Sequence, residues 1–299
     1  MCLKTLKSAL LLCTLAISSH SISSPLSEYN LILSGDYVYH GGEVEGASFI
    51  GGELVAYGHS PTFGTRDIPI ANSLSVVGDI NAANLNINRG NLTYGSALNV
   101  GNVNMNSGGS VSHDNDLSID GLVADLLTQS SYLAGLTSNG VFNAGYLTYT
   151  GSDELAIFEV NFDQVFAQNT TLKLAYGNAS TVVINVHGEN VNVAGGVNIT
   201  DGFRNLGANN IIWNFADASS INFNSICMYG AVLAINAELS GGCVFDGGVA
   251  AKSYEGSAEF HQFLTSTPPP TSNIEVSSPT MSILILSLFA GILIRRRFA

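Results

Sequence analysis

Short pairs of apolar residues recur through the first half of the chain, and their spacing is the strongest constraint on its fold. The two residues of each pair are two positions apart, so both side chains lie on the same side of a strand. The pairs between Ile80 and Met105 are Leu85 and Ile87, Leu92 and Tyr94, Leu98 and Val100, and Val103 and Met105. The spacing from Ile80 to Leu98 equals the spacing from Ile87 to Met105. This period predicts a β-solenoid (a parallel β-helix) with about 18 residues and three short strands per coil.

Asn and Gly fill the positions between the pairs. Gly adopts left-handed corner conformations without strain and Asn tolerates them, so both suit the corners of a coil. Only 11% of the residues are charged, while 32 are Gly, which favours turn-rich β structure over a helical bundle. A sandwich of hairpins is the alternative, but it would need strands of about five to six residues and clear two-residue turns. We therefore expect an all-β dominated fold, and a solenoid in preference to a sandwich.

One segment, Ser118 to Leu136, has helical spacing instead. Its apolar residues form a single stripe and are Ile119, Leu122, Val123, Leu126, Leu127, Leu133 and Leu136. Asp116 and Ser118 stand where an N-terminal cap is expected. Because only one face is apolar, we expect one α-helix packed alongside the solenoid. The β pattern resumes at Phe142.

Two similar segments near the end of the domain each begin with a cysteine. The spacing between Cys227 and Cys243 is nearly the same as that between the glycines that follow them, Gly230 and Gly247. These spacings suit neighbouring coils of one stack, where strands lie about 4.8 Å apart, close to the Cα separation in a disulfide. In an exported protein we therefore predict a disulfide between the two cysteines, with two buried free thiols as the alternative.

The N-terminal segment, residues 1–24, has the layout of a secretory signal peptide. Two lysines precede a short apolar run, Ala9 to Ile17, and small residues follow it. As a helix this run spans about 14 Å, too short for a hydrocarbon layer of about 30 Å. A lipoprotein signal at Cys13 is the alternative, but Leu12 stands where a small residue is expected. We expect residues 1–24 to be removed on export.

The end of the chain has the layout of a membrane tail. Residues 266–280 are rich in Pro, Ser and Thr, which is typical of a solvated linker. Residues 281–299 hold an apolar run, about 21 Å long as a helix, followed by Arg295, Arg296 and Arg297. The positive-inside tendency would keep these arginines in the cytoplasm.

This order of a proline motif, a short apolar helix and an arginine cluster resembles the PEP-CTERM sorting tails of Gram-negative bacteria. The sequence reads Ser-Pro-Thr around Pro279, where that family has Pro-Glu-Pro. The resemblance implies transient anchoring in the inner membrane and processing near Pro279 by an exosortase-type enzyme. A plain C-terminal anchor, with a transmembrane helix that is not cleaved, is the alternative.

Removing both ends leaves one domain, residues 25–265. It keeps five basic residues against 22 or 23 acidic ones, a net charge near −18. Such a charge argues against nucleic acid and other polyanions as partners. Divalent cations and neutral glycans remain compatible with it.

Seven segments of this domain carry a family resemblance through their order and spacing. They are Tyr29 to Asp36, Val44 to Gly46, Gly51 to Gly52, Val183 to Val186, Trp213 to Phe215, Gly230 to Ala234 and Glu259 to His261. Together they resemble the choice-of-anchor A family of bacterial surface domains, over about residues 27–264. The resemblance implies an adhesive role at the cell surface, with no agreed ligand. The second half is also similar to the β-solenoid fold of bacterial ice-binding proteins, which packs a helix beside its coils.

Two acidic clusters are candidates for a chemical site. Glu43 and Glu45 are candidate functional carboxylates, although a turn cap and a solvated side chain explain them more simply. Asp114, Asp116 and Asp120 crowd the start of the predicted helix, where acidic residues favour the helix dipole. Calcium is the alternative there, but no EF-hand spacing is present.

Two aromatic positions are also candidates. His261 beside Glu259 has the composition of a general base, but a single His in a terminal β segment is more often structural. Trp213 is expected in the solenoid core rather than as a stacking platform for a glycan.

The sequence contains no catalytic triad, phosphate loop or metal-ligand cluster. We therefore expect a non-enzymatic adhesin of the cell surface or extracellular matrix, acting in attachment or biofilm. It would use no cofactor and bind an extracellular glycan or protein. An ice-binding protein is the first alternative. The second is a β-helix enzyme that degrades polysaccharide, which would need carboxylates with Lys or Arg in one groove.

Overall fold

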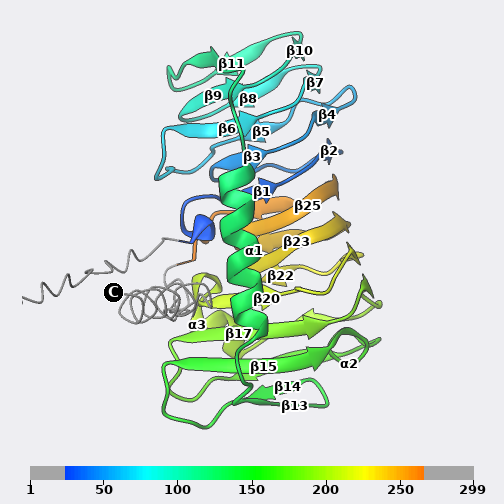
Figure 1. Cartoon of the computed structure of the whole chain (residues 1–299). Coiled ribbons are helices and arrows are strands. Elements are labelled where there is room, and N and C mark those ends of the chain that lie inside the picture. The colour runs from blue at the N-terminus through cyan, green and yellow to red at the C-terminus, as the bar shows by residue number, and fades with distance from the viewer. Residues whose placement is uncertain (1–23, 266–299) are drawn as a thin grey trace, which may run out of the picture. The chain divides into compact units, whose positions relative to one another are not determined.

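The computed structural model describes residues 24–265, which form a stack of β-strand coils (Figure 1). The predicted signal peptide (apart from Ser24), the linker and the sorting tail with its transmembrane helix, Pro279 and Arg295 to Arg297 lie outside the described residues. Within residues 24–265, no helix is long and apolar enough to cross a membrane. The described part begins with a short 3-10 helix, η1 (Pro25–Ser27).

The first half of the domain builds the upper coils from short strands. They are β1 (Leu31–Leu33), β2 (Tyr37–Tyr39), β3 (Ser48–Ile50), β4 (Leu54–Ala56), β5 (Thr62–Phe63), β6 (Asn72–Val76), β7 (Ile80–Ala82), β8 (Leu85–Ile87), β9 (Asn91–Tyr94), β10 (Leu98–Val100), β11 (Val103–Met105) and β12 (Val111–His113). The helix α1 (Asp120–Ala134) follows and runs back along the stack toward its other end (Figure 1).

The second half builds the lower coils. Its strands are β13 (Val141–Asn143), β14 (Tyr146–Thr148), β15 (Leu155–Asn161), β16 (Thr171–Ala175), β17 (Thr181–His187), β18 (Asn190–Asn192), β19 (Asn198–Ile199), β20 (Ile211–Asn214), β21 (Ser220–Asn222), β22 (Met228–Tyr229), β23 (Ala231–Ser240), β24 (Val244–Asp246), β25 (Val249–Gly256) and β26 (Glu259–His261). The short helices α2 (Phe162–Val165), α3 (Gly202–Leu206) and η2 (Ala208–Asn210) lie between them.

The two halves meet in the middle of the stack. β25 pairs in parallel with both β1 and β2, which places Val249 beside Leu31 and Tyr254 beside Tyr37. The chain therefore starts in the middle, winds to the upper end, returns through α1, and winds from the lower end back to its start (Figure 1).

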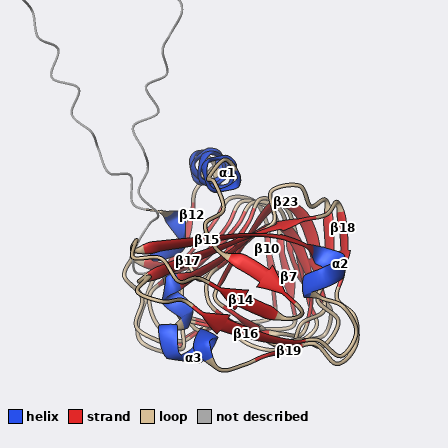
Figure 2. Ribbon diagram, turned by 90° about the horizontal axis from the view of Figure 1, so that it is seen from below, coloured by secondary structure: helices blue, strands red, loops and turns tan. Residues whose placement is uncertain are grey.

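Each coil has three sides, which Figure 2 shows end-on. Side A contains β1, β3, β6, β9, β12, β15, β17, β20 and the first parts of β23 and β25. Side B contains β2, β4, β7, β10, β18, β21 and the last parts of β23 and β25. Side C contains β5, β8, β11, β22, β24 and β26, with β13, β14, β16 and β19 at its lower end.

The predicted solenoid is confirmed. The predicted repeat of about 18 residues per coil holds in the uppermost coils but not along the whole stack. Ile80 pairs with Leu98, and the same sequence step joins Leu85 of β8 to Val103 of β11. The lowest coils are longer, because the step from Val182 to its partner Ile211 spans a much larger stretch of sequence than the step from Ile212 to Ala231 in the next coil. Segments such as α2 and α3 are inserted at the corners of these coils, as Figure 2 shows, and they lengthen the coil without changing the strand stacking.

The inward side chains of the three sides fill one apolar core. Trp213 is fully buried within it, and its ring stacks on Phe203 with the ring centroids 5.7 Å apart. The indole Nε1 donates a hydrogen bond to the carbonyl of Tyr229 at 2.9 Å, which satisfies the only polar atom of the side chain. Trp213 is therefore a core residue, as predicted, and not a glycan platform.

The helix α1 covers side A. Its buried Leu126 and Leu133 belong to a second apolar cluster that includes Val183 and Ile212 of the sheet. Figure 2 shows α1 outside the coils and against this one side. The single apolar stripe thus predicted the position of the helix correctly. The observed helix is shorter than the predicted segment, from Asp120 to Ala134.

Polar groups fix α1 at its contact with the sheet. The buried amide of Asn214 donates to the carbonyl of Ser130 at 3.0 Å, and the Ser130 hydroxyl donates to Asn214 Oδ1 at 2.7 Å. Asn185 Nδ2 donates to the carbonyl of Leu133 at 2.8 Å. Just before the helix, the Ser118 hydroxyl accepts a hydrogen bond from the Asp120 N–H at 3.2 Å. The N-cap position itself is Ile119, which makes no side-chain capping hydrogen bond, so the predicted cap at Ser118 stands one residue before the observed N-cap.

Cys227 and Cys243 form a disulfide. Their Cα atoms are 4.9 Å apart, and they precede β22 and β24, which are adjacent parallel strands of side C. The structure therefore agrees with the pairing predicted from the spacing of the two cysteines.

Candidate functional site

Sides B and C are exposed along the stack, whereas α1 covers side A from β3 down to β17. On the upper part of side C, outward Asn and Thr side chains form columns that run from coil to coil. Asn104 Nδ2 donates to Asn86 Oδ1 at 2.8 Å, and Asn86 Nδ2 donates to Thr62 Oγ1 at 3.3 Å. A second column links Asn106 to Asn88 at 2.6 Å. These amides largely satisfy one another, so they stabilise the stacking more than they offer a binding surface.

Side B has a different surface in its upper and lower halves. In the upper half, the register of the strands places Val38, Val55, Asn81 and Asn99 in one outward column. Asn99 Nδ2 donates to Asn81 Oδ1 at 2.9 Å. In the lower half, the outward residues are polar and surround a shallow groove.

This lower groove lies across β18, β21 and β23 and has a volume of about 370 Å³. Its outward-facing residues stand in two columns and are Asn190, Ser220 and Glu238 in one, and Asn192, Asn222 and Ser240 in the other. Val191, Ile221 and Leu239, which lie between the columns, point into the core. Sequence reasoning missed this groove because its residues come from three separate coils.

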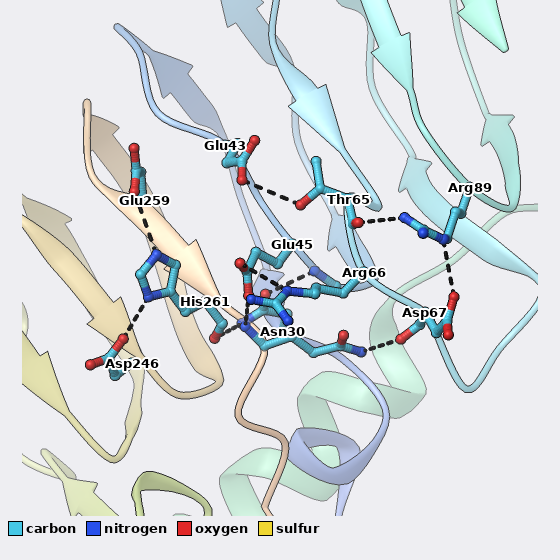
Figure 3. A network of polar contacts seen from close by, with 12 residues as sticks. Asn30, Glu43, Glu45, Thr65, Arg66, Asp67, Arg89, Asp246, Glu259 and His261 are labelled. Atoms are coloured by element: carbon cyan, nitrogen blue, oxygen red, sulfur yellow. Dashed lines mark hydrogen bonds and ion pairs between the residues drawn. The ribbon is translucent and has the colours of Figure 1, made fainter. Parts of the chain in front are cut away.

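A network of charged side chains lies on side C where the two halves of the chain meet (Figure 3). We call it the seam network. It brings together the candidate residues Glu43, Glu45, Glu259 and His261, which come from opposite ends of the described chain. The bridges from Val44 to Phe260 and to Phe63 set this arrangement, because they align the first, second and last coils.

Glu45 is the buried acid of the seam network. Its residue exposure is 9%, and Oε1 accepts a hydrogen bond from Arg66 Nε at 3.2 Å. Oε2 accepts from the backbone N–H of Gln262 at 2.9 Å, which ties the last strand to the first coil. Glu43 accepts a weaker hydrogen bond from the Thr65 hydroxyl at 3.3 Å. Both carboxylates therefore join segments of the seam.

His261 is held between two carboxylates. Nδ1 lies 2.6 Å from Asp246 Oδ1, and Nε2 lies 3.4 Å from Glu259 Oε2 (Figure 3). Partial burial acts against the charged ring, but the Asp246 hydrogen bond and the nearby charges of Asp246, Glu45 and Glu259 outweigh it. The pKa of His261 is consequently raised above its ordinary value. With a carboxylate beside each ring nitrogen, His261 links β24 and β26 within the seam.

A second histidine has the same arrangement. His187, at the end of β17, contacts Asp217 through Nδ1 at 2.9 Å and Glu159 through Nε2. The hydrogen bonds to Asp217 and then Glu159 raise the pKa of His187 above its ordinary value. Glu159, His187 and Asp217 are separated in sequence by about one turn of the lowest coils. The sequence alone would have revealed this cluster only if the length of those coils had been known.

The acidic cluster at the start of α1 is exposed. Asp114 accepts a hydrogen bond from the Asp116 N–H at 3.0 Å, and Asp120 occupies the first turn of the helix. Among residues 24–265, no three His, Cys, Asp or Glu side chains are grouped so that they could hold a metal ion. Calcium binding at this cluster stays a prediction.

The geometry defines a class of protein: a β-solenoid of mainly parallel strands, with a helix packed against one side and two exposed sides. Comparison with known families identifies the family within this class. Residues 22–262 match the family described as a putative ice-binding-like adhesive domain, and the chain belongs to this family. This match extends over nearly the whole described part and supports a binding protein rather than an enzyme.

One solved structure is also similar. It is an ice binding protein from an Antarctic biological consortium, with 15% sequence identity and a TM-score of 0.39. The similarity covers 87% of this chain and 94% of that one. A search of curated proteins finds no significant match.

Proposed function

We propose that this protein is an exported, non-enzymatic adhesin that attaches cells through the open sides of its solenoid. The observation that carries the proposal is the presence of two extended polar sides on an adhesive-family fold, with α1 covering only the third. The clusters around His187 and His261 agree with it. Each of these two histidines has a carboxylate beside both ring nitrogens, and neither has a nucleophilic side chain as a hydrogen-bond partner within the described chain.

The stacked strands suit this role because they are ordered before a ligand arrives. Outward side chains of parallel strands repeat about every 4.8 Å, and packing of the core below them restricts their backbone. A surface that is already ordered loses less conformational entropy on binding. The smaller entropy loss matters most for adhesion, because each of its many contacts contributes only a little binding free energy.

The negative charge of the domain opposes adhesion to another anionic surface. Five basic residues stand against 22 acidic ones in residues 24–265, so the domain repels an anionic cell surface. Screening by salt or bridging by a divalent cation would reduce this repulsion. We therefore expect attachment to strengthen when calcium is added, without a dedicated calcium site.

In this proposal, the two ends of the chain direct the protein to the cell surface or the matrix. A signal peptide in residues 1–24 would export the protein, and the tail from Pro279 to Arg297 would hold it transiently in the inner membrane of a Gram-negative bacterium. An exosortase-type enzyme would then release it to the surface or matrix. The adhesive family match is consistent with the finer resemblance to choice-of-anchor A domains.

Deletion of the gene tests the proposed function. Cells that lack the protein should attach less to a surface and form a less cohesive biofilm, and expression of the intact gene should restore both. A deletion strain that attaches and forms biofilm as well as its parent would contradict the proposal.

Ice binding is the second candidate, and the ice-binding-like family description is the observation that favours it. The outward column of Val38, Val55, Asn81 and Asn99 on upper side B is the flat surface that would contact ice. Thermal hysteresis of the purified protein separates the two functions. Hysteresis that an Asn99→Tyr variant abolishes would favour ice binding, and its absence would leave adhesion.

A further inference from the structure

We infer that the lower groove of side B binds neutral glycan chains. This inference rests on the proposed adhesive function and names the ligand class and the place where it binds. The groove crosses three parallel strands, β18, β21 and β23, and the outward side chains along it are amides, hydroxyls and one carboxylate.

The hydrogen-bonding groups of the groove remain available to a ligand. Within residues 24–265, the side chains of Asn192 and Ser240 have no intramolecular hydrogen-bond partner. Asn222 uses Oδ1 to accept from the Asn224 N–H at 2.8 Å, which leaves its NH₂ group open. Asn190 likewise uses only Oδ1, which accepts from the Ser220 hydroxyl at 2.9 Å.

The columns on the upper coils provide an internal comparison. On side C, Asn104 Nδ2 donates to Asn86 Oδ1 and Asn86 Nδ2 donates to Thr62 Oγ1. On side B, Asn99 Nδ2 donates to Asn81 Oδ1. Three upper amides, those of Asn86, Asn99 and Asn104, therefore use their NH₂ groups in stacking. The NH₂ groups of the three groove amides, Asn190, Asn192 and Asn222, have no acceptor among residues 24–265. This difference marks the groove as the part of the amide surface that is suited to an external partner.

Glu238 adds an oriented carboxylate at one end of the groove. Its Oε1 accepts a hydrogen bond from Lys252 Nζ at 2.6 Å, and this contact holds the side chain across the strand. The lysine also keeps the pKa of Glu238 below its ordinary value, so the group stays ionised near neutral pH. A carboxylate accepts two hydrogen bonds from neighbouring hydroxyls, which is the arrangement that a hexose ring presents.

The geometry fits a linear sugar polymer. Asn192, Asn222 and Ser240 are aligned across strands that lie about 4.7–4.9 Å apart, close to the length of one hexose unit. A chain lying across the strands would therefore meet one polar side chain per sugar. An anionic polymer would be repelled by Glu238 and by the charge of the domain, and an apolar ligand would find no outward apolar side chain among the six groove residues.

Affinity electrophoresis of the purified full-length protein tests the inference. The gels contain hydroxyethyl cellulose, laminarin, mannan or dextran as neutral probes, and alginate as the anionic probe. The variant combines Asn192→Ala with Ser240→Ala, which removes one exposed and one half-buried side chain, both without a structural partner, and should leave the melting temperature unchanged. The control is Asn99→Ala, an exposed amide in the uppermost coil of the same side.

We expect at least one neutral polymer to retard the wild type and the Asn99→Ala control equally. The double variant should bind that polymer at least ten-fold more weakly, and alginate should retard none of them. Retardation of the double variant equal to that of the wild type would overturn the inference, as would preferential binding of alginate. If no neutral polymer binds while the gene remains necessary for attachment, the glycan inference fails and the adhesive function stands.

Discussion

Val249 lies beside Leu31 in adjacent parallel strands, although the two residues belong to opposite ends of the described chain. This contact closes the stack, because it joins the last lower coil to the first upper one. The seam network on side C and the pairing of Tyr254 with Tyr37 reinforce the same junction. The stability of the domain should therefore depend on this seam more than on the outer coils.

The first prediction concerns the buried carboxylate of the seam. Replacing Glu45 with Ala removes the acceptor of the Gln262 N–H and the partner of Arg66. We expect the free energy of unfolding to fall by about 1–3 kcal/mol, measured by urea denaturation. Glu43→Ala is the matched control on the same side and should cost less than about 0.5 kcal/mol. Equal losses in the two variants would show that Glu45 has no special role at the seam.

The disulfide gives the second prediction. Replacing Cys227 and Cys243 together by Ser should lower the stability of the oxidised protein by about 3 kcal/mol, because a bridge closing a loop of this size restricts the unfolded chain. A reducing agent should lower the melting temperature of the wild type and leave the double variant unaffected. Peptide mapping that finds free thiols in the exported, folded protein would contradict the pairing.

A pH dependence follows from His187. Its pKa is raised in the folded state by Asp217 and Glu159, so the folded protein binds the proton more tightly than the unfolded chain does. The stabilisation is fully present below the ordinary value of 6.5 and is lost as the pH rises through the folded-state pKa.

The measurement for His187 is the melting temperature from pH 5.5 to 8.5. The wild type should lose more stability over this range than a His187→Gln variant. High salt should narrow the difference, because the side chain is nearly half exposed. Identical pH profiles of the two proteins would show that the ion pairs do not persist in solution.

The tail allows a prediction about processing. If an exosortase-type enzyme cleaves near Pro279, mass spectrometry of the surface protein should find no peptide that contains Arg295 to Arg297. Changing the three arginines to Gln should leave the unprocessed chain in the inner membrane. A mature surface protein that retains Arg297 would leave the plain anchor as the explanation.

Much of the fold could be predicted from the sequence because it depends on local spacing. The step from Ile80 to Leu98 revealed the solenoid, and the single apolar stripe of the helix placed it against one side. The coil order could not be predicted in this way. The pairing of β25 with β1 depends on the return of the chain along α1, and no local pattern encodes that return.

The candidate surfaces were less predictable for the same reason. Glu43, Glu45, Glu259 and His261 were noticed in the sequence, but their common location became visible only once Val44 was placed beside Phe260. The partners of His187 and the groove residues recur at coil lengths that vary with the inserted corner segments. Trp213 was predictable as a core residue because an apolar strand surrounds it on both sides.

Binding of labelled, purified full-length protein to cells that lack the gene tests whether the domain is an adhesin. An adhesin should show saturable binding that unlabelled protein displaces and that increases when calcium or salt screens the acidic charge. The polysaccharides of the cell surface should keep their length during the incubation. Absence of saturable binding to cells or matrix, or shortening of a polysaccharide by the wild type, would contradict a non-enzymatic adhesin.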